Sequence, residues 1–338
     1  KKNLTSLPQK LRIRDILRII HTHLRFFASF AIAGALVGAL SFVAPQTAPL
    51  VAATFVSAAA RAEEASAPSP FGAPNLTARA AVVMDAATGE TLFEKQVDAQ
   101  LPLASLTKIM TVETALAAAP RYALVPVLPE FLETEGDSGL VSEESWALKD
   151  LLSFTLVASS NDGAVAAAAI GGSFLSQSGT RAENREAFIA AMNREAAERG
   201  LESMYFLNET GLDETGEIAG GYGSARDIAC LIASAYRAHP ELFDATAMSS
   251  ALFTEENGNQ HSANNTNTAA AAIPLLRASK TGTTDLAGGN LAVVFDAGVG
   301  KPIAVAVLGS TEEGRFADVQ ALVAATLQFL QRNDSLPL

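Results

Sequence analysis

The sequence has 338 residues, of which 49% are hydrophobic, and its 36 acidic side chains outnumber the 24 Lys and Arg residues to give a formal net charge of −12. This length suffices for one large domain or two smaller ones, and the acidic balance excludes the basic surface that nucleic-acid binding requires, so we expect no nucleic-acid partner. The single cysteine, Cys230, excludes an intrachain disulfide.

A basic segment followed by an apolar run comes first. Residues 1–25 hold seven Lys and Arg residues against one acid, Asp15, and residues 26–44 are nineteen apolar or small residues without charge. Such a run is long enough for a helix to span a bilayer, and positively charged flanks stay on the cytoplasmic side. We therefore expect a basic cytoplasmic tail at 1–25, a transmembrane signal-anchor at 26–44, and an extracytoplasmic location for the rest of the chain.

The next region has the composition of a linker. A linker is expected over residues 45–75: Pro45 and Pro49 interrupt the apolar run, and residues 63–75 are rich in Pro, Ala and Ser with no room for a packed face. Ala60-Arg-Ala62 before Glu63 is also an acceptable cleavage site for a signal peptide, so a cleaved, secreted form is the alternative to an anchored one. The folded domain is expected over residues 76–335.

Strands at both ends of this domain enclose a series of helices. Two strands, at 80–86 and 91–94, are predicted to form a β-hairpin. Apolar periodicity then predicts helices from Ser105 to Ala119 and over 146–157, 162–170, 183–199 and 225–238. Residues 244–267 are polar and predict a loop; strands at 273–280, 290–297 and 303–309 and a helix at 316–331 follow. This order favours an α+β domain in which helices cover one antiparallel sheet.

Ser105-Leu-Thr-Lys108 has the spacing of a nucleophile and its base. On a helix the lysine lies one turn after the serine, on the same face, and a serine hydroxyl becomes a good nucleophile once a neighbouring base removes its proton. A lysine can serve as that base near neutral pH only if its pKa falls by about 3 units from its usual value of about 10.4. Burial and a second nearby cation both lower it, so we expect Lys108 to be buried and near another lysine.

Two further stretches carry groups that suit the same chemistry. Ser159-Ser-Asn161 follows an apolar helical run, and Lys280-Thr-Gly-Thr283 precedes an apolar run. Each alone also fits a helix cap or a turn. The order and spacing of the three stretches, however, are those of the penicillin-recognising serine enzymes.

The sequence from about Ala80 to Arg315 resembles the D-alanyl-D-alanine carboxypeptidases, which are the low-molecular-mass penicillin-binding proteins. Weaker stretches occur in the same order as in that family: Glu135-Gly-Asp-Ser-Gly139, Asn208-Glu-Thr-Gly-Leu212, Ser224-Ala-Arg-Asp227 and Asn264-Asn-Thr-Asn267. The resemblance implies a β-lactamase/DD-peptidase-like fold, in which a five-stranded antiparallel sheet is flanked by helices and carries an inserted all-helical subdomain. The active site is expected between sheet and subdomain.

The resemblance also implies the activity and the residues that perform it. A serine D-Ala-D-Ala carboxypeptidase removes the terminal D-alanine from peptidoglycan stem peptides through an acyl-enzyme, here on Ser105. Lys108 would take the serine proton, Ser159 would relay a proton to the departing nitrogen, and Asn161 would contact Lys108 and the substrate amide. Lys280 is the fifth implied catalytic residue and the expected second cation, and it also suits a substrate with a free carboxylate. The residues implied to bind the substrate are Thr281, Gly282, Thr283 and Arg315. The backbone N–H groups of Ser105 and Thr283 would form the oxyanion hole.

No cofactor and no metal are expected, because the sequence has no cluster of metal-ligating residues. The implied partners are the stem peptide, β-lactam antibiotics as covalent inhibitors, and the bacterial inner membrane through the N-terminal segment, with the domain in the periplasm or facing the wall. Members of this family often carry a C-terminal β-rich domain and an amphipathic helix; few residues follow Leu330, so the N-terminal segment is expected to supply any anchoring.

Three alternatives remain at this point. A DD-endopeptidase of the same family shares all three stretches, because they do not determine how long a leaving group is accepted. A class A β-lactamase also shares them but needs a glutamate that positions the deacylating water, and Leu207-Asn-Glu209 has the reverse order of the expected pattern. A non-catalytic wall-binding scaffold is disfavoured because the catalytic residue types are all present.

Overall fold

The structure is a computed structural model, and it describes residues 71–72, 74–176 and 179–334. The predicted basic tail, the signal-anchor and the linker up to residue 70 lie outside the described residues. Within the described part of the chain, no helix combines the length and the hydropathy that are needed to cross a bilayer. Phe71, which the composition places in the linker, is buried, and its ring lies 5.3 Å from that of Phe329.

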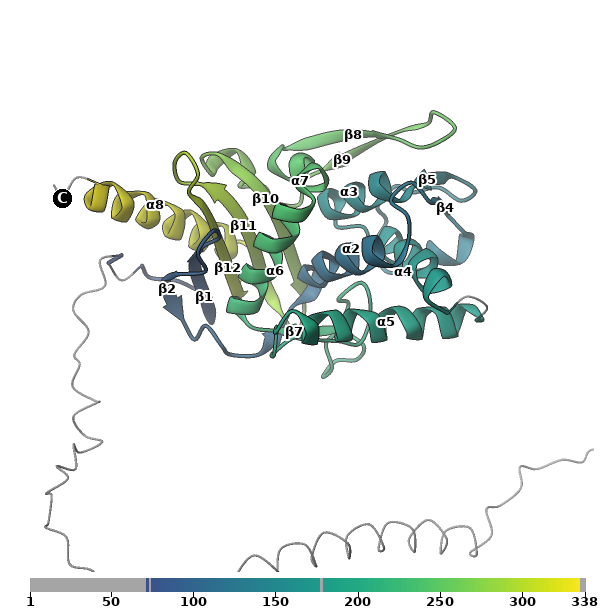
Figure 1. Ribbon diagram of the computed structural model, residues 1–338, viewed down its shortest axis with the longest axis horizontal. Coiled ribbons are helices and arrows are strands. Elements are labelled where there is room, and N and C mark those ends of the chain that lie inside the picture. The colour runs from purple at the N-terminus through teal and green to yellow at the C-terminus, as the bar shows by residue number, and fades with distance from the viewer. Residues whose placement is uncertain (1–70, 73, 177–178, 335–338) are drawn as a thin grey trace, which may run out of the picture. The chain divides into compact units, whose positions relative to one another are not determined.

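One antiparallel sheet of five strands has the order β10-β11-β12-β1-β2 (Figure 1). The N-terminal hairpin pairs β1 (Ala80–Asp85) with β2 (Thr91–Lys95) and was predicted from the sequence. The three C-terminal strands are β10 (Leu276–Thr284), β11 (Gly288–Asp296) and β12 (Pro302–Ser310). Pairing of β1 with β12 joins the two ends of the domain, which leaves β10 at one edge of the sheet.

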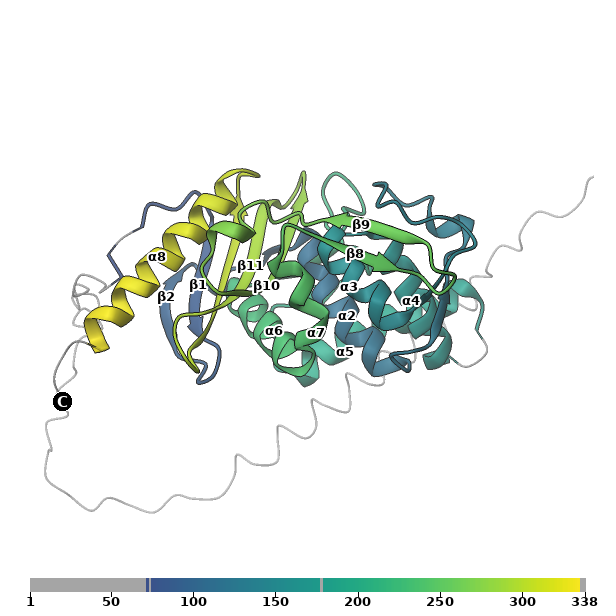
Figure 2. The same ribbon diagram turned by 90° about the horizontal axis from the view of Figure 1, so that it is seen from above.

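Helices cover both faces of this sheet, as Figure 2 shows. Alternate residues of β1 illustrate the two sides: Val82 packs into the core that contains α6 (Ala225–Ala238), and Val83 packs into the core that contains α8 (Gly314–Asp334). Because both faces are buried, strands β11 and β12 are almost continuously apolar, which is why the sequence predicted them well.

The helical subdomain surrounds one central helix, α2 (Thr107–Ala118), whose residues 107–115 are all buried. Around it lie α3 (Leu148–Ala158), α4 (Asn161–Ser176) and α5 (Arg181–Glu198). The short α7 (Pro240–Phe243) packs against α3 and α6. Helices α4 and α5 approach closely at Gly172, where a Cβ would lie 2.1 Å from the carbonyl oxygen of Asn184. The predicted helices thus form, and α4 extends beyond its predicted end at residue 170 because small residues continue to pack.

The sequence did not predict several short strands. Strands β3 (Leu101–Pro102), β7 (Gly221–Gly223) and β6 (Tyr205–Phe206) form one small sheet. Strand β4 (Leu124–Pro126) pairs with β5 (Ser145–Ala147), so the residues before Leu148 belong to a strand and not to the predicted helix.

The expected loop at 244–267 is a second difference. It contains a 3₁₀ turn at Asp244–Ala247 and a hairpin of β8 (Ser250–Thr254) with β9 (Gln260–Asn264). Most residues of this hairpin are exposed or half-buried, so it lacks the apolar alternation by which a strand is recognised in a sequence.

Candidate active site

Ser105 and Lys108 lie next to each other at the start of the central helix. Ser105 belongs to a 3₁₀ turn, Ala104–Leu106, and α2 begins two residues later than the serine, at Thr107. Lys108 Nζ is 2.9 Å from Ser105 Oγ, within hydrogen-bond distance. Ser105 is half-buried and so remains accessible, whereas Lys108 is completely buried. The predicted juxtaposition across one helical turn is therefore present.

The Lys108 amine is held by two groups that come from distant parts of the chain. Its Nζ donates to Asn161 Oδ1 at 2.6 Å and to the carbonyl oxygen of Thr210 at 2.8 Å. Burial lowers the pKa of Lys108 to about 7, and the negative charges of Glu209 and Asp162 act in the opposite direction. Near neutral pH the amine is thus divided between its charged and neutral forms, as a lysine base requires.

Ser159 and Lys280 form a second hydroxyl–amine pair. Ser159 ends α3 in a left-handed conformation, with φ of 57°, and Asn161 begins α4 directly afterwards. Lys280, in the middle of β10, donates from Nζ to Ser159 Oγ at 2.7 Å and to the carbonyl oxygen of Thr281 at 2.8 Å. The turn between α3 and α4 therefore brings Ser159 to Lys280 and Asn161 to Lys108.

The second cation acts differently from the sequence-based expectation. The pKa of Lys280 is lowered well below its usual value, first by burial and then by the positive charges of Lys108 and Arg315. For Lys108, burial is the largest cause of the lowered pKa, and the charges that act on it most are carboxylates, which raise it. Burial, and not a second cation, is accordingly the main reason that the pKa of Lys108 is low.

The loop Glu135–Gly139 supports Asn161. Its Glu135 carbonyl oxygen accepts a hydrogen bond from Asn161 Nδ2 at 2.6 Å, and Ser138 Oγ donates to Asp162 Oδ2 at 3.1 Å. These bonds leave Asn161 Oδ1 directed at the amine of Lys108. One of the weaker family stretches therefore orients a side chain of the predicted site.

Gly282 lets the edge strand β10 approach the backbone around Ser105. A Cβ at this position would lie 2.8 Å from the carbonyl oxygen of Leu103, closer than real Cβ atoms come, and 3.0 Å from the nitrogen of Ser105, which is also a tight contact. On the same strand, Thr281 Oγ1 lies 2.6 Å from Thr266 Oγ1 in the Asn264–Asn267 stretch. Strand β10 and the Ser105 turn are thus close enough for both to contact one bound substrate.

Arg315 lies beside β10 as well. It is buried and donates from Nη1 to the carbonyl oxygen of Gly282 at 3.0 Å and to Thr283 Oγ1. Burial lowers the pKa of its guanidinium group. The structure therefore gives Arg315 contacts that hold Thr283 and the strand in place, and its implied contact with a substrate carboxylate stays a prediction.

Two groups that contact this site were not predicted from the sequence. One is the carbonyl oxygen of Thr210, which accepts from Lys108. The other is the completely buried Asn290 on β11, whose Nδ2 donates to the carbonyl oxygens of Pro102 and Leu103, at 3.0 Å each, just before the Ser105 turn. The sequence held a signal for each group. Asn290 is a polar residue at the start of an apolar strand, and Thr210 lies in the family stretch Asn208–Leu212.

The arrangement suits acyl transfer through a serine. A half-exposed hydroxyl adjoins a buried amine with a pKa of about 7, and a second hydroxyl adjoins a second buried amine. Within the described residues, no group of three or more His, Cys, Asp or Glu side chains could hold a metal ion.

Comparisons with known proteins agree with this chemistry. The sequence model of a family described as D-alanyl-D-alanine carboxypeptidase matches residues 64–312. The D-alanyl-D-alanine carboxypeptidase DacF of Bacillus subtilis is 33% identical over 160 residues, which are 46% of this chain and 38% of that protein. A D-alanyl-D-alanine endopeptidase of Pseudomonas aeruginosa is 31% identical over 161 residues, 45% of this chain and 48% of that protein. The chain thus spans less than half the length of either relative.

A solved structure has the same fold. The DD-transpeptidase of Streptomyces K15 superposes with a TM-score of 0.65 at 24% identity, over 75% of this chain and 97% of that one. The α+β fold expected from the sequence, with its five-stranded antiparallel sheet and helical insertion, is therefore confirmed.

Proposed function

The chain belongs to the D-alanyl-D-alanine carboxypeptidase family, and from this premise we propose that it is a serine hydrolase that removes the terminal D-alanine of peptidoglycan stem peptides. One observation carries the proposal: a buried lysine with a pKa of about 7 lies 2.9 Å from the hydroxyl of a half-exposed serine.

In the acylation step, Ser105 Oγ attacks the carbonyl carbon of the bond between the two D-alanines while Lys108 Nζ takes the hydroxyl proton. Negative charge then develops on the carbonyl oxygen. The backbone N–H groups of Ser105 and Thr283 are the proposed donors to it, and each such donor is worth about 3 kcal/mol in the transition state. Support for this pairing is the close approach of β10 to the Ser105 turn at Gly282.

Departure of the D-alanine requires a proton on its nitrogen as the C–N bond breaks. Ser159 Oγ, which is held by a hydrogen bond from Lys280 Nζ, is the proposed relay: it gives its proton to the nitrogen and takes up the proton that Lys108 received from Ser105. Lys108 is then uncharged again. Water then attacks the ester carbonyl of the acyl-enzyme, with Lys108 again as base, and releases the shortened peptide and the free Ser105 hydroxyl.

The free carboxylate of the substrate is proposed to bind beside β10, where Thr281 and Thr283 offer hydroxyls and Lys280 an amine. Arg315 supports this site by holding Thr283. A carboxylate near Lys280 favours the charged form of its amine. Burial lowers the pKa of Lys280 in the free protein, and a bound carboxylate is expected to raise it.

A DD-endopeptidase is the second candidate, and the similarity to the endopeptidase of Pseudomonas aeruginosa favours it. A class A β-lactamase finds less support. Glu209 lies nearest to the sequence pattern of its deacylating glutamate, but both carboxylate oxygens of Glu209 accept hydrogen bonds from Arg185 Nε, at 3.0 Å each.

Two assays test the proposal. The purified protein should release free D-alanine from a synthetic peptide that ends in two D-alanines, and activity on crosslinked muropeptides alone would favour the endopeptidase. Fluorescent penicillin should label the wild type covalently, Ser105→Ala should not be labelled, and the control Ser234→Ala on α6 should be labelled normally. An unlabelled wild type would favour the non-catalytic scaffold.

We also propose that residues 26–44 anchor the chain in the inner membrane with the domain outside the cytoplasm. The support is the sequence pattern of a basic tail before an uncharged apolar run. Mass spectrometry of the mature N-terminus tests it, and a protein that starts at Glu63 would contradict the anchor in favour of the secreted form.

A further inference from the structure

A buried carboxylate lies close to the amine of Lys108. The side chain of Glu209 is 2% exposed, and its segment runs along helix α2. Thr111 Oγ1 of that helix donates to the carbonyl oxygen of Glu209 at 2.7 Å, and Lys108 Nζ donates to that of Thr210 at 2.8 Å. The negative charge of Glu209 raises the pKa of Lys108 and so opposes the effect of burial. Taken alone, it makes Lys108 a poorer base near neutral pH.

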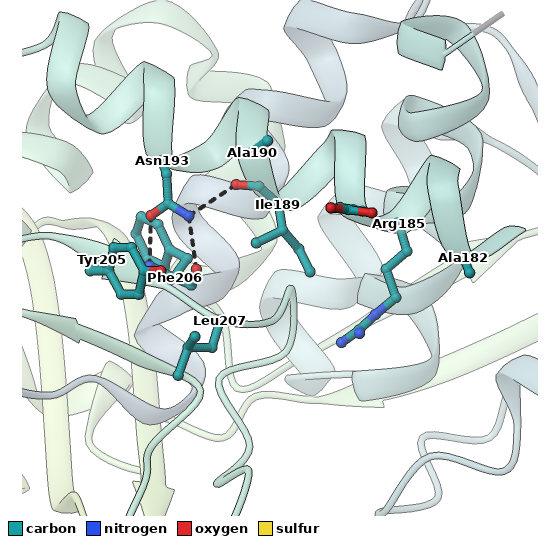
Figure 3. Close-up of a pocket in the computed structure, with 9 residues that line it drawn as sticks. Ala182, Arg185, Ile189, Ala190, Asn193, Tyr205, Phe206 and Leu207 are labelled. Atoms are coloured by element: carbon teal, nitrogen blue, oxygen red, sulfur yellow. Dashed lines mark hydrogen bonds between the residues drawn. The ribbon is translucent and has the colours of Figure 1, made fainter. Parts of the chain in front are cut away.

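Arg185 neutralises this carboxylate from the other side. It lies on α5, and its Nε donates to both carboxylate oxygens of Glu209 at 3.0 Å. Its side chain is 47% exposed and lines a surface pocket of about 520 Å³ together with Ile189, Asn193 and Tyr205 (Figure 3). The Arg185–Glu209 ion pair therefore connects a solvent-accessible guanidinium group with a buried carboxylate that acts on Lys108.

We propose that Arg185 is a positioning residue for acylation: by pairing with Glu209 it offsets the charge of that carboxylate and keeps Lys108 available as an uncharged base at neutral pH. The inference rests on the proposed function, because Lys108 must be the base. It assigns a role to a residue outside the three motif stretches, more than seventy positions along the chain from Lys108.

Other charged groups also face Lys108, but none of those described below offsets the charge of Glu209 as Arg185 does. Asp162 on α4 is hydrogen-bonded to Ser138 and raises the pKa of Lys108 in the same way as Glu209. Lys280 on β10 donates a hydrogen bond to Ser159, and burial lowers its pKa. Arg185 is thus the cation that the structure places against a carboxylate acting on Lys108. Because Arg185 is half-exposed, solvent screens part of its effect.

The test is the pH dependence of the rate at which fluorescent penicillin acylates Ser105. The rate should rise with pH as Lys108 loses its proton. Arg185→Gln should move the midpoint of this rise to higher pH by roughly half a unit or more, because the carboxylate then favours the charged amine without compensation. Below the midpoint this lowers the rate by roughly threefold. Arg185→Lys should restore most of the wild-type profile.

Removing the carboxylate of Glu209 should shift the midpoint in the opposite direction. Glu209→Gln should move the midpoint to lower pH, and the double variant Arg185→Gln/Glu209→Gln should match Glu209→Gln alone, since the arginine acts only through the carboxylate. Arg194→Gln is the matched control: it removes another α5 arginine, whose ion pair with Glu198 is exposed, and should leave the profile unchanged. A purely structural role for Arg185 would lower the rate at every pH without moving the midpoint.

An unchanged midpoint in Arg185→Gln overturns the inference. If that variant does not fold, an unchanged midpoint in Glu209→Gln overturns it instead. A wild type that penicillin does not label contradicts the proposed function but leaves the inference testable. The protonation of Lys108 can then be followed by NMR titration of isotope-labelled lysine in the same variants, and equal titration midpoints would refute the effect of Arg185.

Discussion

Replacing Gly282 by alanine should separate the edge strand from the Ser105 turn. The added Cβ would lie 2.8 Å from the carbonyl oxygen of Leu103, 3.0 Å from the nitrogen of Ser105 and 3.1 Å from that of Leu106. All three neighbours are backbone atoms, which cannot rotate away as a side chain can. To restore ordinary contact at 3.4 Å, the strand or the turn must move by about half an ångström.

This movement should affect catalysis more than stability. Overpacking of this kind costs about 1–3 kcal/mol of folding free energy, which a domain of this size tolerates. The two proposed oxyanion donors, however, lie on opposite sides of the contact. Loss of one correctly placed donor lowers a rate by a factor of about 10²–10³. We therefore expect Gly282→Ala to fold, with acylation by penicillin slowed about a hundredfold or more.

The assay compares the acylation rate with the thermal unfolding midpoint for Gly282→Ala and for a control, Gly216→Ala. Gly216 has no heavy atom within 4 Å of an added Cβ and does not have a positive φ. The control should resemble the wild type in both measurements. A folded Gly282→Ala protein that acylates at the wild-type rate would refute the argument that the close contact positions the oxyanion hole.

Three further results are expected. The free energy of unfolding should increase with pH between about 7 and 10, so the protein becomes more stable. The reason is that the unfolded chain binds the Lys108 proton up to its ordinary pKa of about 10.4, whereas the folded chain releases it near 7. Denaturant titrations that show no such increase would contradict the low pKa. Lys280→Ala should raise KM for peptides with a free C-terminal carboxylate more than it lowers kcat, and an unchanged KM would count against carboxylate recognition. Asn290→Ala should lower stability by about 1–3 kcal/mol, since it removes donors to buried carbonyl oxygens; it should also slow acylation, both measurable on one preparation.

Local features of the chain were predictable because they depend on neighbours in sequence. The Ser105–Lys108 spacing determines that the two side chains share a helix face, and helix α6 has the predicted bounds, 225–238. The apolar strands β11 and β12 were recognisable for the same reason. The polar hairpin β8–β9 was not, because backbone pairing with little burial leaves no periodic pattern.

The sequence by itself determined which side chains are available and, through the motif order, that three distant stretches should converge. It also required Lys108 to be buried if it is to act as a base. Only the tertiary structure decided what surrounds the amine: a carbonyl oxygen at Thr210, 102 positions away, and a carboxylate at Glu209 that is held by Arg185. The physical reason is that a pKa depends on burial and on charges brought close by packing, and neither is a property of adjacent residues.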